Sequence, residues 1–193
     1  MAGCGDLLIG QLEFYWDVHL WPRLQGLTDE EYLWEPVDGM WSVRPDENGQ
    51  TIYELADPVP DPPPLTTIAW RMVHIGVGCF AIRVNAFFED GPDDADMFDP
   101  RHIPAEVPAT AAAGLEFLRH WYGRWHASIR GLDKDALWSP LGPKGAYFAD
   151  DPMLGLITHI NREVMHHGAE ICLLRDLYRA QVGSNHDARV RPA

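Results

Sequence analysis

The sequence has few of the residues on which several large classes of protein depend. Of its 193 residues only 15 are Lys or Arg, against 29 Asp or Glu, which gives a net charge of −14. Nucleic-acid binding needs clustered basic side chains, so this balance argues against a DNA or RNA partner. No apolar run approaches the roughly 20 residues that span a bilayer, and the N-terminal segment lacks the basic and apolar regions of a signal peptide. We therefore expect a cytoplasmic protein with no membrane partner.

Cysteine is also scarce. Cys4, Cys79 and Cys172 lie far apart and form no CxxC pair. We expect all three to be reduced, two of them serving as small apolar residues on helices. Hydrophobic residues, in contrast, make up 46% of the 193 residues. A chain of this length and composition can bury one good-sized core, so a single domain is the expectation.

Four long segments have the periodicity of amphipathic helices, at residues 6–24, 66–88, 109–132 and 152–182. Pro22 is expected to end or kink the first of them. Thr28 and Glu31 have the spacing of a capping box at the start of a short helix. Residues 36–64 are too rich in proline for a long helix, and a short strand pair is expected near residues 41–43 and 52–54.

These elements predict an all-α protein, a four-helix bundle with long connecting loops. The bundle is expected to form one domain over residues 1–182, followed by a polar C-terminal tail at 183–193. Aromatic residues such as Trp21 and Trp121 could serve a homodimer contact, and burial in the core explains them equally well.

The most informative pattern lies on the last helical segment. His159, Glu163 and His167 are spaced four residues apart, so they share one helix face. They interrupt a stripe that is apolar at both ends, and burying such groups is costly unless something pairs with them. The second segment contributes His74 from an otherwise apolar face. With a divalent metal, His74, Glu163 and His167 would make a site of two His and one carboxylate, with water in the open position.

Each proposed ligand has a structural alternative. His74 could be a hydrogen-bonded core residue, and Glu163 could pair with Arg162 or Arg71. His167 could hydrogen-bond a buried hydroxyl group. An E-x-x-x-H spacing is weak by itself, because helices carry such pairs by chance. The position in mid-helix and the facing histidine strengthen the metal hypothesis.

Two neighbouring features bear on the same site. Gly76, Gly78 and Ala81 lie within two turns of His74, and paired glycines in a helix indicate close packing or open space. That space would admit a metal, a water molecule and a substrate atom. His166 is the main competitor of His167 as a ligand. It follows Glu163 by three residues rather than four, so it points partly away.

Three segments, in order, resemble a known family. The run HINREVMHHGAEICLLRDLY resembles the last-helix signature of the DinB/YfiT-like superfamily, H-x-x-N-H-x-x-x-H-x-G-Q. The opening LLIGQLEFYWDVHLWPRLQGLTDEEYLWEPVDGMWSVRP is similar to the start of its actinobacterial members. TIAWRMVHIG matches their second-helix metal histidine. The resemblance covers nearly the whole chain.

This resemblance implies a bundle that binds Zn or Ni through one His of the second helix and two residues, four apart, of the last. The matching positions are His74, Glu163 and His167. Most relatives have His at the position of Glu163, but the mycothiol-dependent maleylpyruvate isomerase branch has Glu there, in a run like R-E-V-x-x-H. His159 on the preceding turn, and Glu170 where many relatives carry Gln, are candidates to orient the ligating imidazoles.

The resemblance also implies thiol-linked chemistry, because members use mycothiol, bacillithiol or a related low-molecular-weight thiol. The first hypothesis is a metal-dependent thiol S-transferase or isomerase acting on a small electrophile. Arg71 and Arg162 lie near the proposed metal and are candidates to bind a carboxylate of the substrate or cofactor. One alternative is a metal-dependent hydrolase with Glu170 or His159 as general base. The other is a non-catalytic, metal- or ligand-binding stress protein.

Overall fold

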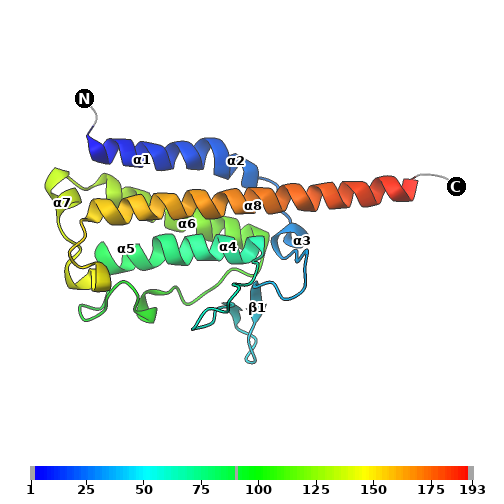
Figure 1. The fold of residues 1–193 in the computed structure, drawn as a ribbon, viewed down its shortest axis with the longest axis horizontal. Helices are drawn as coiled ribbons and strands as arrows, with labels where there is room; N and C mark the ends of the chain where they lie inside the picture. The colour runs from blue at the N-terminus through cyan, green and yellow to red at the C-terminus, as the bar shows by residue number, and fades with distance from the viewer. Residues whose placement is uncertain (1–2, 90, 191–193) are drawn as a thin grey trace.

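The protein folds into a bundle of four helical rods, as Figure 1 shows for a computed structural model that describes residues 3–89 and 91–190, with side chains described up to Val182. The first rod comprises α1 (Cys4–Phe14), η1 (Tyr15–Leu20) and α2 (Trp21–Leu24), and the second α4 (Ile68–His74), η2 (Ile75–Ala81) and α5 (Ile82–Phe87). The third and fourth are α6 (Ala111–Arg130) and α8 (Met153–Val190). The predicted all-α bundle is therefore confirmed.

Short elements connect the rods. They are α3 (Asp29–Tyr32), β1 (Val43–Pro45), β2 (Thr51–Tyr53), η3 (Pro100–His102), α7 (Lys134–Trp138) and η4 (Gly142–Phe148). Strands β1 and β2 form an antiparallel hairpin in which Val43 lies opposite Tyr53. This confirms a strand pair in the proline-rich segment, displaced slightly from the predicted residues. The capping box is also present, since Thr28 Oγ1 accepts from the Glu31 amide and Glu31 returns a bond to the Thr28 amide.

The expected effect of Pro22 and one predicted helix boundary differ from the structure. Pro22 does not end the first rod, because the chain stays helical through it: Pro22 lies in α2, which follows directly on the π-helical segment η1. The rod ends at Leu24, the predicted residue, and is followed by Gln25 in an extended conformation and Gly26 with φ of 68°. Helix α8 runs on to Val190, past the predicted end at residue 182, and extends beyond the other helices in Figure 1. Residues 191–193 of the predicted tail lie outside the described residues.

The second rod is the most deeply buried, and a π-helical segment lies at its centre. Segment η2 starts directly after His74 and is buried over most of its length. A π-helical turn inserts an extra residue into the helical ladder, and such turns are frequent at functional sites. Simple α-helical periodicity does not predict it. The insertion changes which side chains of this rod face α6 and which face α8.

The two glycines of η2 have different roles. A Cβ built at Gly76 would lie 2.8 Å from Phe117 Cδ1 of α6, so this glycine permits close packing of the two rods. The expectation that Gly76 opens space for a metal is therefore wrong. A Cβ at Gly78 would lie 3.4 Å from His74 Cε1, so Gly78 is the one beside the proposed ligand.

Gly76→Ala is expected to lower the free energy of unfolding by about 1–3 kcal/mol, because Phe117 must move away from the new methyl group. Gly123 on α6 provides the matched control, since a Cβ there would meet nothing within 4 Å. Gly123→Ala should stabilise the protein by up to about 1 kcal/mol through helix propensity alone. Urea unfolding of both variants measures the difference, and equal effects would contradict the packing role of Gly76.

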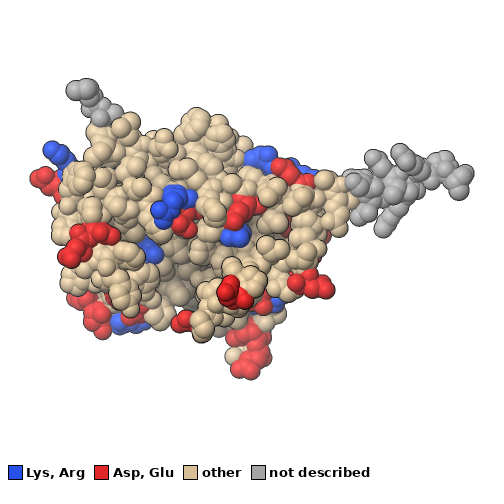
Figure 2. Space-filling model, in the orientation of Figure 1, with Lys and Arg blue, Asp and Glu red and all other residues tan. Residues whose placement is uncertain are grey.

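The surface is acidic and mixed in sign. On the face drawn in Figure 2, Lys and Arg occur as separate groups among Asp and Glu, with no broad basic patch over the coloured part. None of the described helices combines the length and apolar character needed to cross a membrane. All three cysteines are free thiols. Trp21 and Trp121 pack partly buried against the core, and a homodimer stays a prediction.

Candidate metal centre

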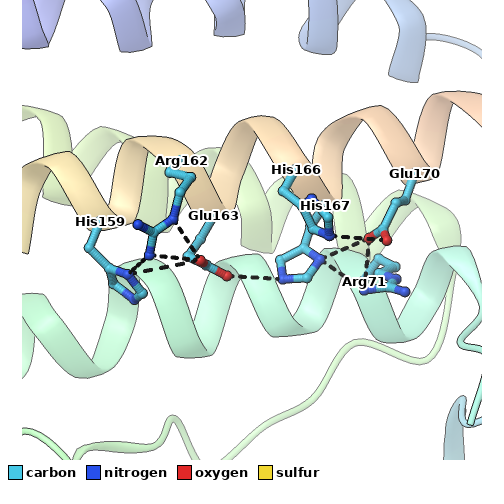
Figure 3. Close-up of polar contacts among 7 residues, drawn as sticks. All are labelled: Arg71, His159, Arg162, Glu163, His166, His167 and Glu170. Atoms are coloured by element: carbon cyan, nitrogen blue, oxygen red, sulfur yellow. Dashed lines mark hydrogen bonds and ion pairs between the residues drawn. The ribbon is translucent and has the colours of Figure 1, made fainter. Parts of the chain in front are cut away.

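His159, Glu163 and His167 of α8, here called the ladder, form a chain of polar contacts that faces the second rod (Figure 3). Glu163 lies at its centre and contacts a histidine on each side. Its Oε1 lies 3.8 Å from His159 Nδ1, and its Oε2 lies 3.4 Å from His167 Nε2. His167 is buried and Glu163 half-buried, whereas 44% of the His159 side chain is exposed. The contact between α8 and the second rod is therefore most enclosed between Glu163 and His167.

His74 reaches the same place from the end of α4. Its ring meets the His167 ring edge-on, with centroids 4.7 Å apart, and stacks on Trp70 at 4.8 Å. It makes no hydrogen bond or ion pair with any described residue. Burial lowers the pKa of His74 to about 4, reinforced by the charges of His167 when it is protonated and of Arg71, and opposed by Glu163. His74 is therefore neutral at physiological pH, which is the form that ligates a metal.

The donor types of the three residues, and the spacing between Glu163 and His167, fit a divalent ion. Two ligand atoms on a tetrahedral Zn²⁺ with bonds of about 2.0–2.1 Å lie about 3.3–3.4 Å apart. Glu163 Oε2 and His167 Nε2 are 3.4 Å apart. Two imidazole nitrogens and one carboxylate oxygen are donors that suit Zn and Ni. The neutral His74 ring, with no other polar partner, completes a set that could hold such an ion.

A second His-His-Glu cluster shares His167. The ligand atoms of His166, His167 and Glu170 all lie within 4.8 Å of one another. Among the described residues this is the one group of three that meets this spacing, so His74, Glu163 and His167 stand further apart. The second cluster uses the opposite ring nitrogen, since His167 Nδ1 lies 2.9 Å from Glu170 Oε2. His166, with 65% of its side chain exposed, contributes Nε2 at 3.4 Å from Glu170 Oε1.

Arg71 weakens the case for a metal in the second cluster. Its Nη1 lies 2.8 Å from Glu170 Oε2 and 2.8 Å from His167 Nδ1. A guanidinium is always protonated in proteins, so its positive charge already occupies the space between these two ligand atoms. A metal bound there would have to displace Arg71. On the Nε2 side of His167 the polar neighbour is the Glu163 carboxylate, and that side is electrostatically better suited to a cation.

Glu170 and Arg71 decide which nitrogen of His167 is free. His167 Nδ1 cannot both accept from Arg71 and donate to Glu170, because one ring nitrogen carries either a proton or a lone pair. When Nδ1–H donates to Glu170, the lone pair lies on Nε2 and points towards Glu163. Arg71 then pairs with Glu170 and holds that carboxylate in place. This geometry supports the predicted role of Glu170 in orienting the imidazole.

Arg162 has a corresponding role at the other end of the ladder. Its Nη2 donates to His159 Nδ1 at 2.5 Å and to Glu163 Oε1 at 3.4 Å. Since Nδ1 accepts, the proton of the neutral His159 ring is on Nε2. Burial, followed by Arg162 and Arg83, lowers the pKa of His159 against the opposing charge of Glu163. These contacts hold Oε1 of Glu163 and leave Oε2 directed at His167.

The two arginines proposed as anion-binding groups differ in availability. Arg71 is half-buried and paired with Glu170, whereas 67% of the Arg162 side chain is exposed. Whether either binds a cofactor or substrate stays a prediction. A third arginine near the contact between α8 and the second rod, Arg83 on α5, was missed, although a single charge within the apolar run GCFAIRV was a signal for it.

Glu170→Ala is expected to weaken metal binding by about 10- to 100-fold, the usual cost of removing a group that orients a ligating histidine. Without this carboxylate, Arg71 donates to His167 Nδ1, and the proton moves to the nitrogen that should face the metal. Titration with Zn²⁺ against a chromophoric chelator measures the loss. Glu170→Gln should retain most of the affinity, because the amide oxygen still accepts from Nδ1–H.

Glu116→Ala, an exposed glutamate on α6, is the matched control for the lost negative charge. An affinity in Glu170→Ala equal to that of this control would show that Glu170 does not orient His167.

Comparison with known proteins identifies a family. Residues 11–171 match the family model described as the DinB superfamily, a span that includes all the ladder residues, Arg71 and His74. No curated protein and no solved structure matches the chain.

Proposed function

The chain belongs to the DinB superfamily, and from this premise we propose that it is a metal-dependent enzyme using a low-molecular-weight thiol of the mycothiol type. The reaction would be S-transfer to a small electrophile, or a thiol-dependent isomerisation. The metal would be Zn or Ni, held by His74, Glu163 and His167. The main observation in support is the neutral His74 ring, without a polar partner, next to a His–carboxylate pair at ligand spacing.

A divalent ion bound there supplies Lewis acidity, which lowers the pKa of a thiol or water molecule into the physiological range. The protein residues position the ligands. Glu170, held by Arg71, accepts the Nδ1 proton of His167 and fixes its ring. Arg162 holds one oxygen of Glu163, and Trp70 covers one face of His74. Each ligand is thus restrained by a second residue before an ion arrives, which favours a defined coordination geometry.

Arg162 is the better placed of the two predicted anion-binding arginines. Its exposed guanidinium contacts Glu163 and can turn to a carboxylate of the substrate or thiol with little loss, because exposed ion pairs contribute about 1 kcal/mol or less. To bind such a carboxylate, Arg71 would have to give up its ion pair with Glu170 and its contact with His167. We therefore assign Arg71 to positioning and Arg162 to binding the small molecule.

The test combines metal content with thiol dependence. Elemental analysis of the purified protein should find about one Zn or Ni per chain. The loaded protein should then consume a chromogenic electrophile only when mycothiol or a similar thiol is added. Turnover of an ester without thiol would favour the hydrolase. Metal binding without turnover would favour a non-catalytic stress protein, and absence of metal after loading would overturn both enzyme hypotheses.

A further inference from the structure

A cavity of about 420 Å³ lies beside the ladder, between α5, the segment at Met97 and Phe98, η4 and the first turns of α8. This volume is in the usual range for small-molecule sites. Its apolar wall includes Phe98, Phe148 and Leu156. Its polar lining includes Arg83, His159 and Arg162. The cavity therefore combines an apolar wall with positive charge.

Arg83 is the unusual residue of this cavity. It is only 7% exposed, and its Nη1 donates to the Met97 carbonyl oxygen at 2.8 Å. Its guanidinium carbon lies 5.4 Å from the centre of the Phe98 ring, and its Nε has no hydrogen-bond partner. Among the residues that the structure describes, no carboxylate pairs with it. Burying an unpaired charge is unfavourable, so Arg83 lacks an anion that a ligand could supply.

The other polar residues connect this cavity to the proposed metal ligands. Arg162 and His159 line it and also contact Glu163, at 3.4 Å and 3.8 Å. A molecule held at Arg83 can therefore extend along α8 towards Glu163. Asp151 also lines the cavity, but its side chain is exposed to solvent. Its charge is better screened than that of the buried arginine.

We propose that this cavity binds a small carboxylate with an aromatic or aliphatic body. Its carboxylate pairs with Arg83, and its apolar part packs against Phe98, Phe148 and Leu156. Arg162 lies on the side of the cavity that contacts Glu163. That this ligand is the electrophilic substrate rests on the proposed function, whereas its binding depends only on Arg83 and the apolar wall.

The test compares 3-phenylpropionate with its neutral amide, 3-phenylpropanamide, by calorimetry and protein-observed NMR. The acid should bind at least about tenfold more tightly, because hydrogen bonds between charged groups are worth at least that factor. Its addition should shift the Nε–H resonance of Arg83, and the amide should not. Both results should persist after the metal is removed with a chelator. The chelator experiment separates the two proposals, because binding of the acid in the cavity should be unchanged even if the protein binds no metal.

Arg83→Met should abolish the preference for the acid, and Arg83→Lys should retain part of it. Arg119→Met, an exposed arginine of α6, is the matched control and should bind as wild type. Equal binding of acid and amide, no binding of either, or loss of acid binding on chelation would overturn the proposal. If Arg83→Met does not fold, as judged by circular dichroism, the wild-type acid–amide comparison and the Arg83 resonance decide the question.

Discussion

His74→Ala is expected to abolish binding of Zn or Ni, whereas His166→Ala is expected to leave the metal content unchanged. His74 would supply one of three protein ligands. Its removal should therefore lower the metal affinity by more than the factor of about 10 to 100 that is typical of groups outside the coordination shell. His166 lies on the side of His167 where Arg71 places a fixed positive charge. Elemental analysis and a chelator competition titration measure both variants.

The two histidines discriminate between the ligand sets because His167 belongs to both. A His167 variant would lose metal in either case, and a Glu163 variant would alter the contacts of Arg162 as well. His74→Ala also removes the ring that stacks on Trp70, so its thermal unfolding should be compared with that of the wild type. Loss of metal in His166→Ala, with metal retained in His74→Ala, would place the site at Glu170.

The neighbourhood of the ladder could be predicted, but its hydrogen bonding could not. Residues four apart on one helix share a face whatever the fold, so contacts of Glu163 with His159 and His167 follow from spacing. That His74 meets His167 follows from pairing the second and last helices of a bundle. The contact of Arg71 with Glu170 joins residues distant in the chain. This contact depends on how each helix is rotated about its axis. The π-helical segment η2 changes that rotation within the second rod.

Burial near the end of the bundle was predicted less well. Leu177 continues the apolar spacing of the last helical segment, yet it is 49% exposed. Arg175 is instead completely buried, two residues earlier. Residue type gives the wrong expectation for Arg175, because a charged side chain is normally exposed to solvent. Only the fold shows that α3 brings Glu31 opposite Arg175, and Glu31 was recognised solely as part of a capping box.

Arg175→Met is expected to lower the free energy of unfolding by about 3–5 kcal/mol, the usual cost of breaking a buried ion pair from one side. Arg175 donates from Nε and Nη2 to the two oxygens of Glu31, at 3.1 and 2.7 Å. It also donates to the carbonyl oxygens of Arg23 and Gln25. The variant leaves Glu31 buried with the Thr28 amide and Arg179, at 3.3 Å, as its remaining partners among the described residues. Urea unfolding at neutral pH measures the loss.

The same pair should make the stability depend on acidic pH. Burial alone would raise the pKa of Glu31, but the hydrogen bonds and charge of Arg175, the Thr28 amide and Arg179 outweigh it and lower the pKa. A carboxyl group with a lower pKa in the folded state stabilises the protein above its unfolded pKa of about 4.3. That contribution is lost as the pH falls through the folded value. Arg175→Met should therefore show a weaker decline in stability below this pH than the wild type.

Arg23→Met provides the matched control, because it also removes an arginine from an ion pair. Arg23 contacts Asp176 at 2.6 Å, but the two side chains are 42% and 59% exposed, and such pairs contribute about 1 kcal/mol or less. The double variant Arg175→Met, Glu31→Gln should be less destabilised than the sum of the single changes, since neither then leaves a buried charge unpaired. If Arg175→Met and Arg23→Met lost equal stability, the buried pair would not anchor α3 to α8. The apolar contacts of the bundle would then have to hold that end together.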